Sequence, residues 1–237
     1  KKGVCDVLTG KVFFYCVYVT DGESRFTSAD EAKQEQLLQQ FCAYLQTQAA
    51  AEGVSLTTGL ETLPVTLPAP ILDRNDDLWQ KAFARSSGLG SSSEIIPALR
   101  ARHPGYKPAI LFLLNRPGRS YAHFCNTPDR DAMEYCVLYQ PDLRAIVHET
   151  LHIFGAVDFY HPEAVKAAAE QHLGHSVMTN ISVEIDDATK YLIGWHKAPA
   201  PTAESFFRAT AHISKSFMSQ SQSRQNSHRN GFGTDTW

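Results

Sequence analysis

The residues best suited to chemistry lie in one short stretch of the chain, His148-Glu149-Thr150-Leu151-His152. In a helix, a spacing of four places His148 and His152 on one face, one turn apart, where both imidazoles can reach a single metal ion. Glu149, beside the first histidine, can hold and deprotonate a water activated by that metal. A buried pair of core histidines would give the same five-residue pattern, so the motif needs support from the residues around it.

Three features downstream of the motif give that support. Gly155 follows His152 by three residues and would let the helix end and the chain reverse, because glycine tolerates positive φ. The reversed chain could then bring Asp158, three positions later, back to the metal. Met178 follows in the string HSVMTN, and residues 185–195 have the pattern of an N-capped helix closed by a glycine.

The chain thus has the pattern HExxHxxGxxD, followed by a methionine and then by a C-terminal helix. In this order of features the sequence resembles the metzincin clan of zinc metallopeptidases, whose third ligand is usually histidine. An aspartate at that place is similar to snapalysin-type metzincins. The resemblance implies that zinc is bound by His148, His152 and Asp158. It also implies that Glu149 is general base and acid and that Met178 forms a hydrophobic floor beneath the metal.

The chain departs from the clan's pattern in two ways. Several metzincin families have a tyrosine two residues after the methionine, where this chain has Asn180, so we expect no tyrosine ligand. A carboxylate ligand such as Asp158 donates negative charge and should make the metal's water less acidic than three histidines would. Tyr160 could line the cleft, although an aromatic residue at a buried turn is more often packing. Other candidates for the third ligand are a glutamate, His161, His172 and His175.

The remaining sequence predicts the scaffold that must position these residues. Aromatic and β-branched runs predict strands, and capping residues such as Ser28 with Glu31, and Asp142, mark helix starts. Residues 63–74, with three prolines, are expected to be a loop. The expected strands are 12–20, 54–58, 108–114, 120–125 and 134–139, and the expected helices are 30–52, 76–86, 93–102 and 142–154, with a further helix starting at His161-Pro162.

We therefore expect an α+β fold with a mixed five-stranded sheet and two long helices, the backing helix 30–52 and the active-site helix 142–154. The metzincin resemblance covers about residues 142–195 by motif and residues 1–141 by architecture alone. It implies an N-terminal subdomain over 1–155, a smaller C-terminal subdomain over 156–200, and an extension over 201–237. Within the extension, residues 202–218 have helical spacing and 219–237 a flexible composition. The insertion over 70–105 could shape one rim of the cleft.

Composition narrows the classes of partner. The chain has 237 residues, 43% of them hydrophobic, and a net charge of −3, which argues against nucleic acid and anionic membranes as partners. No apolar run reaches the roughly 18 residues of a membrane span. The absence of an initial Met slightly favours a secreted or exported protein whose leader was removed. Five cysteines without a CxxC spacing argue against a cysteine zinc site and leave open one or two disulfides or five buried thiols.

These features predict a monomeric zinc metalloendopeptidase. A peptide or protein substrate would bind extended along an exposed sheet edge, and the resemblance to the metzincin clan implies residues 120–125 as the best candidate. The wall of the main specificity pocket would come from residues 176–192. The alternative is a catalytically silent metal-binding or interaction module on the same fold, although an intact Glu149 argues against silence, since metal binding alone would not require it.

Overall fold

The computed structural model describes residues 5–71, 76–89, 94–125, 131–180 and 182–213. The protein has an α+β fold, as expected, with five strands and seven α-helices in the described part of the chain. The elements follow in this order: β1 (Gly10–Thr20), α1 (Ser28–Ala51), β2 (Leu56–Thr66), α2 (Asp76–Ser87), α3 (Ile95–Arg102), β3 (Lys107–Leu114), β4 (Tyr121–His123), β5 (Tyr135–Tyr139), α4 (Leu143–Ile153), α5 (Glu163–His172), the 3₁₀ helix η2 (Val177–Thr179), α6 (Asp187–Leu192) and a last helix over 201–213.

The sheet is mixed, in the order β2-β1-β3-β5-β4, and confirms the expected five strands. β1, β2, β3 and β5 run parallel, and β4 pairs antiparallel with β5 at one edge. The apolar runs of β1 and β3 fall on neighbouring central strands, where both faces are covered and nearly every side chain is buried. Among the described strands, the short β4 has a neighbour on one side alone, so its other edge is unpaired there.

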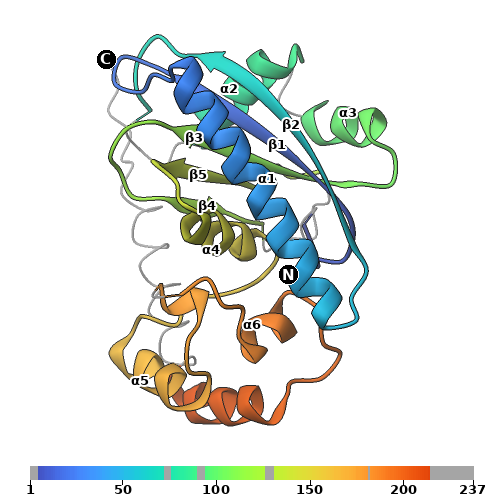
Figure 1. Ribbon diagram of the computed structural model, residues 1–237, viewed down its shortest axis with the longest axis vertical. Coiled ribbons are helices and arrows are strands. Elements are labelled where there is room, and N and C mark those ends of the chain that lie inside the picture. Colours follow the sequence, from blue (N-terminus) through green and yellow to red (C-terminus); the bar gives the residue numbers. More distant parts are fainter. Residues whose placement is uncertain (1–4, 72–75, 90–93, 126–130, 181, 214–237) are drawn as a thin grey trace, which may run out of the picture.

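Helices cover both faces of the sheet (Figure 1). Successive residues of a strand point to opposite faces, so Phe14 packs on Phe41 of α1 at 5.0 Å between ring centroids, while Tyr15 meets Phe83 of α2 at 6.1 Å. α4 lies on the face of α1, against β5 and β4, and α3 packs with α2 on the opposite face. The helix that carries the HETLH motif is therefore fixed against the edge of the sheet that ends in β4.

Several boundaries differ from the sequence prediction. β2 runs from Leu56 to Thr66 and includes part of the segment expected to be a loop, because an edge strand tolerates the missing N–H of Pro64. β4 has three residues, not the six predicted over 120–125. The capping box of α1 is formed by Thr27 and Asp30, one residue before the predicted pair. Asp142 caps α4 as predicted, accepting a hydrogen bond from the Ala145 N–H at 2.7 Å.

Two further expectations are settled by this arrangement. The described part of the segment 70–105 forms α2 and α3 on the face opposite α4, and none of its described residues lines the cavity beside α4, so it shapes no rim there. All five cysteines are free thiols, so no disulfide is present. Residues 201–213 form the predicted helix, and the stretch 219–237 lies outside the described residues. No helix in the described ranges is long and apolar enough to cross a membrane.

The chain after α4 forms the lower part of the view in Figure 1 and is tied back to the sheet by the N-terminal segment. The Leu8 N–H donates to the Ile193 carbonyl at 2.9 Å, and the Trp195 indole N–H donates to the Leu8 carbonyl at 2.7 Å. Between them, Gly194 has φ +86° and lies where a side chain would strike Val7. The segment that precedes β1 thus fixes the position of α6.

An ion-pair network makes the second connection, between the end of α1 and α6. Glu52 lies 2.7 Å from the Lys190 ammonium and 2.9 Å from His196 Nε2. These hydrogen bonds, from Lys190 first and then His196, lower the pKa of Glu52 below its usual value although burial opposes the shift. Because the folded state prefers the charged carboxylate, this network stabilises the protein above the pKa of an unfolded glutamate and loses its effect as pH falls through the folded value.

We predict that Glu52→Gln lowers the free energy of unfolding by about 0.5–1 kcal/mol at pH 7, the range of partly exposed ion pairs. The deficit should be smaller at pH 3, because protonation of the wild-type carboxyl is further advanced there than at pH 7. Urea unfolding of both proteins at the two pH values measures it, with Glu35→Gln on the exposed side of α1 as the control. A deficit that is equal at both pH values would contradict the assigned cause.

Candidate metal centre

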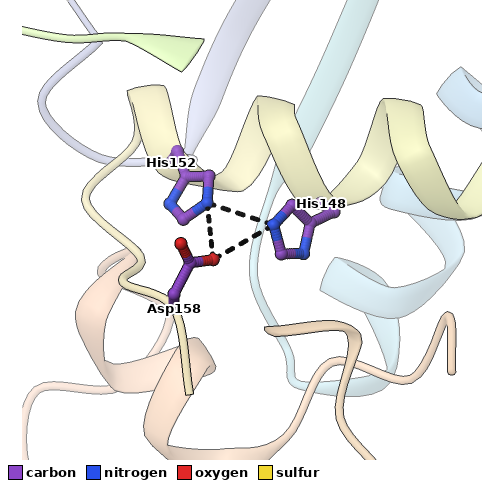
Figure 2. Close-up of side chains that lie close together, drawn as sticks. All are labelled: His148, His152 and Asp158. Atoms are coloured by element: carbon purple, nitrogen blue, oxygen red, sulfur yellow. Dashed lines mark hydrogen bonds and ion pairs between the residues drawn. The ribbon is translucent and has the colours of Figure 1, made fainter. Parts of the chain in front are cut away.

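Three potential ligand atoms converge at the C-terminal half of α4. Figure 2 shows His148, His152 and Asp158 pointing toward one another, the two histidines from α4 and the aspartate from the segment that follows it. His148 Nε2 and His152 Nε2 are 3.2 Å apart, and Asp158 Oδ1 lies 3.2 Å from the first and 3.1 Å from the second. Among the described residues, these three form a group whose ligand atoms could hold a metal ion.

Backbone carbonyls fix the tautomer of both imidazoles. His148 Nδ1 lies 2.8 Å from the Val177 carbonyl oxygen, and His152 Nδ1 lies 3.0 Å from the Ala156 carbonyl oxygen. A carbonyl can only accept, so each Nδ1 carries a hydrogen and donates it. In the neutral ring the proton on Nδ1 leaves a lone pair on Nε2. Both lone pairs therefore face the same point.

The three atoms fit a metal ion better than they fit one another. Asp158 Oδ1 is buried without a hydrogen-bond donor, since the two nitrogens beside it are the lone-pair nitrogens of neutral rings. A buried carboxylate oxygen beside two lone pairs is stabilised by a positive charge between them, either a metal ion or a proton on one of the rings. Atoms bound about 2.0–2.1 Å from a tetrahedral zinc ion lie about 3.3 Å from one another. The observed triangle has almost that size.

A proton on His152 is the other way to satisfy this cluster. Burial by itself lowers the pKa of His152, but the hydrogen bond and the charge of Asp158 raise that pKa above its ordinary value. Burial raises the pKa of Asp158. The hydrogen bonds and charges of the two histidines outweigh burial and hold that pKa well below its usual range. The carboxylate is therefore charged at neutral pH, and a metal ion that binds here would replace the ring proton.

The turn after α4 depends on Gly155. Its φ of +107° ends the helix and reverses the chain, a conformation that disfavours any residue with a side chain. The Ala156 N–H then donates to the Leu151 carbonyl at 3.0 Å, and the Ala156 carbonyl faces His152. The same turn thus orients one histidine and brings Asp158 back toward α4, as the sequence predicted.

The short helix η2 positions the other two ligands through its backbone. The Val177 carbonyl accepts from His148, and the next carbonyl, of Met178, accepts the Phe159 N–H at 2.9 Å, beside Asp158. The Met178 side chain is fully buried. Its assignment as the floor beneath a metal stays a prediction.

A buried carboxylate holds η2 in place. Asp186 accepts hydrogen bonds from the Ser176 hydroxyl at 2.5 Å and the Thr189 hydroxyl at 2.6 Å. The Ser176 oxygen in turn accepts the Met178 N–H at 3.0 Å. Asp186 also caps α6, so the helix and the methionine turn share one acceptor.

A cavity of about 640 Å³ opens beside the three ligands. Its lining includes Glu149 and the three ligand residues, with Ser120, Tyr121, Ala122 and Phe124 along β4. The unpaired edge of β4 is therefore one wall of the cavity. Of the segment 176–192, expected to form the specificity wall, Asn180 is the described residue that lines it.

Tyr160 is the cavity residue that sequence analysis undervalued. The sequence left open whether it lines the cleft or packs at the turn, with packing the more common case. Its ring lies 6.2 Å from that of His148, and it lines the cavity. Burial, followed by the charge of Asp158 and the hydrogen bond with it, raises the pKa of Tyr160, against an opposing effect of Arg119. The sequence signal for a place in the cavity was the position of Tyr160 two residues after Asp158. His161, His172 and His175, the other candidate ligands, do not join the cluster.

Comparison by sequence gives no relative from which a role could be transferred. The chain matches no protein-family model and no curated protein. The site's chemistry must therefore be argued from the arrangement of its own residues.

We predict that Asp186→Asn disturbs His148 through η2. The carboxylate accepts both hydroxyls at Oδ2 and the Thr189 N–H at Oδ1. An amide replaces one of these oxygens by an NH2 group that cannot accept, so stability should fall by about 1–3 kcal/mol, as for a buried unsatisfied group. The imidazole ¹⁵N spectrum should show His148 losing its fixed Nδ1–H tautomer, whereas the neighbouring Asp187→Asn should leave it unchanged. An unaltered His148 signal in Asp186→Asn would contradict the connection.

Proposed function

We propose that this protein is a zinc-dependent endopeptidase of the metzincin type. One observation carries the proposal: three ligand atoms, spaced as around a tetrahedral zinc ion, share a cavity with Glu149. Two imidazoles and one carboxylate suit zinc, whereas calcium and magnesium prefer six or more oxygen ligands. Three protein ligands leave a fourth position for water or substrate, as catalytic rather than structural zinc sites do.

The division of labour in the reaction follows from the ligand set. Zinc, when bound by His148, His152 and Asp158, supplies Lewis acidity to a peptide carbonyl and to a water. Glu149 follows the first ligand on α4 and faces the same cavity while remaining 8% exposed. It accepts the proton of the attacking water and delivers it to the leaving amine. Its burial limits competing contact with bulk solvent.

The free edge of β4 supplies the means to hold a substrate. An extended peptide can add to an exposed strand edge through main-chain hydrogen bonds, which need no particular side chains. Ser120, which precedes β4, lines the same cavity. It is held to the end of β5, because its hydroxyl accepts the Tyr139 N–H at 3.1 Å. An extended peptide along β4 would carry its backbone past the ligands on α4, which is the placement that internal cleavage requires.

The metzincin assignment is supported by the turn and its partners. Gly155 ends the helix with positive φ, Asp158 returns to the histidines, and the helix η2, which contains Met178, contacts His148 through the Val177 carbonyl. The mixed sheet with α1 and α4 on one face agrees with the architecture the resemblance implies. The competing function, a silent metal-binding or interaction module, leaves the position of Glu149 in the cavity without a purpose.

We predict that Glu149→Ala keeps zinc but lowers kcat/KM for peptide hydrolysis by at least about 10²–10⁴-fold, the usual contribution of a general base. Zinc content by mass spectrometry and cleavage of an unbiased peptide library measure the two effects. Glu163→Ala, at an exposed position of α5, is the matched control. Zinc-loaded wild type that hydrolyses no peptide would favour the silent module instead.

We also predict that Asp158→Asn weakens zinc binding by at least about 10–100-fold, because a neutral amide replaces a charged ligand. Competition with a chromophoric chelator gives the dissociation constant. Wild type should bind one zinc ion and lose hydrolysis when the metal is removed. Equal affinity in the variant would show that Asp158 is not a ligand.

A further inference from the structure

The cavity lining is unusual in its side-chain types. No residue of the lining is an aliphatic larger than alanine, so no Leu, Ile, Val or Met faces the space among the residues that the structure describes. Aromatic rings come from Tyr121, Phe124, Tyr139 and Tyr160. Two guanidinium groups, Arg119 and Arg144, complete the wall. Such a cavity does not suit a branched aliphatic side chain and does suit a polar or anionic one.

Arg144 lies on the same stripe of α4 as the metal ligands. It precedes His148 by four residues, one helical turn, which corresponds to about 6 Å along the helix axis. Residues of an extended peptide are about 3.3 Å apart. A guanidinium at this place therefore reaches a substrate group one or two residues from the bond that lies over the metal.

Asn180 holds this guanidinium in position. Arg144 Nη1 donates to the Asn180 carbonyl at 2.8 Å and also contacts the Asn180 side-chain oxygen. Asn180 has φ +65° at the end of η2, so the methionine turn that positions His148 also orients Arg144. Within the described ranges, Nε and Nη2 of Arg144 make no hydrogen bond, since Asp142 Oδ2 is 3.9 Å from Nη2. Two donor groups of an oriented guanidinium are thus available to a ligand.

The local charges favour an anion at this end of the cavity. Asp142 is the single acidic lining residue apart from Glu149 and Asp158, which belong to the metal centre. Its side chain is 65% exposed and already accepts the Ala145 N–H as the cap of α4. One solvated carboxylate therefore opposes two arginines, and a bound metal ion would add further positive charge.

We propose that Arg144, assisted by Arg119, binds a substrate carboxylate one or two residues from the scissile bond. The inference rests on the proposed peptidase function and narrows it to peptides with an anionic group near the cleavage point. Two sources have this chemistry: the side chain of an internal aspartate or glutamate, and the C-terminal carboxylate of the substrate. The first makes the enzyme an acid-directed endopeptidase and the second restricts cleavage to chain ends.

The test uses zinc-loaded Glu149→Ala, in which binding is measured without hydrolysis. Its probes are alanine-based decapeptides, acetylated and amidated, with one glutamate moved along the chain, each matched by a glutamine peptide. A third set carries no acidic side chain but ends in a free carboxylate. Calorimetry should show about 10–100-fold tighter binding for glutamate at one or two adjacent positions, or for the free terminus, as expected for a charge-assisted hydrogen bond.

Three variants made in the Glu149→Ala protein assign the preference. Arg144→Gln should remove the preference for the carboxylate, and Asn180→Ala should reduce that preference. Both variants should keep zinc and the circular dichroism spectrum of the parent. Arg85→Gln, which removes the same charge from the exposed end of α2, should leave it unchanged. Equal binding of glutamate, glutamine and free-carboxylate peptides by the parent would overturn the proposal. So would a preference that survives in Arg144→Gln.

Wild-type cleavage of the same peptides separates this inference from the function on which it rests. Hydrolysis of the glutamate or free-carboxylate peptides with higher kcat/KM than their partners supports both. Arg144-dependent binding without hydrolysis by zinc-loaded wild type would reject the peptidase and keep the carboxylate site. Hydrolysis of all these peptides without a preference for the carboxylate would keep the peptidase and reject the carboxylate site.

Discussion

The two consecutive carbonyls of Val177 and Met178 hold the cluster of His148, His152 and Asp158 in shape. The first fixes the ring of His148 and the second fixes the backbone beside Asp158. Without the first, the imidazole could turn its N–H toward the other ligands and the lone pair would be lost. Because backbone groups make these contacts, they depend on the path of the chain and are insensitive to most side-chain identities. The methionine turn is thus a device for orienting ligands.

That path is fixed from two sides. Asp186 binds the turn to α6, and the N-terminal segment binds the chain beyond α6 to the sheet through Leu8 and Trp195. On the other side, α4 packs its apolar residues against β5 and β4, so the histidines cannot move relative to the strand edge. The ligands therefore come from two parts of the chain that are held together by burial and by hydrogen bonds to buried groups, which are costly to break.

The same turn also links the metal centre to the cavity wall. Asn180, at the end of η2, orients Arg144. The end of the turn thus holds a guanidinium one helical turn from His148. Tyr160 adds a hydroxyl on the other flank of Asp158, and its raised pKa keeps it protonated at neutral pH. The cavity is accordingly rich in hydrogen-bond donors near a negatively charged ligand set.

The sequence by itself determined the parts that depend on local spacing. The i, i+4 histidines, the Asp142 cap, the positive-φ glycine and the buried runs of β1 and β3 follow from periodicity and backbone sterics, and Asp158 followed from the length of the turn. Tertiary structure decided what depends on distant segments. The edge position of β2 made Pro64 acceptable in a strand. The described part of the segment 70–105 covers the sheet face away from the cavity, and Arg144, Asn180 and Tyr160 come together in the lining of that cavity. These groupings depend on how elements that are distant in the sequence pack together. Contacts between such elements follow no periodicity along the chain, so the sequence alone does not predict them.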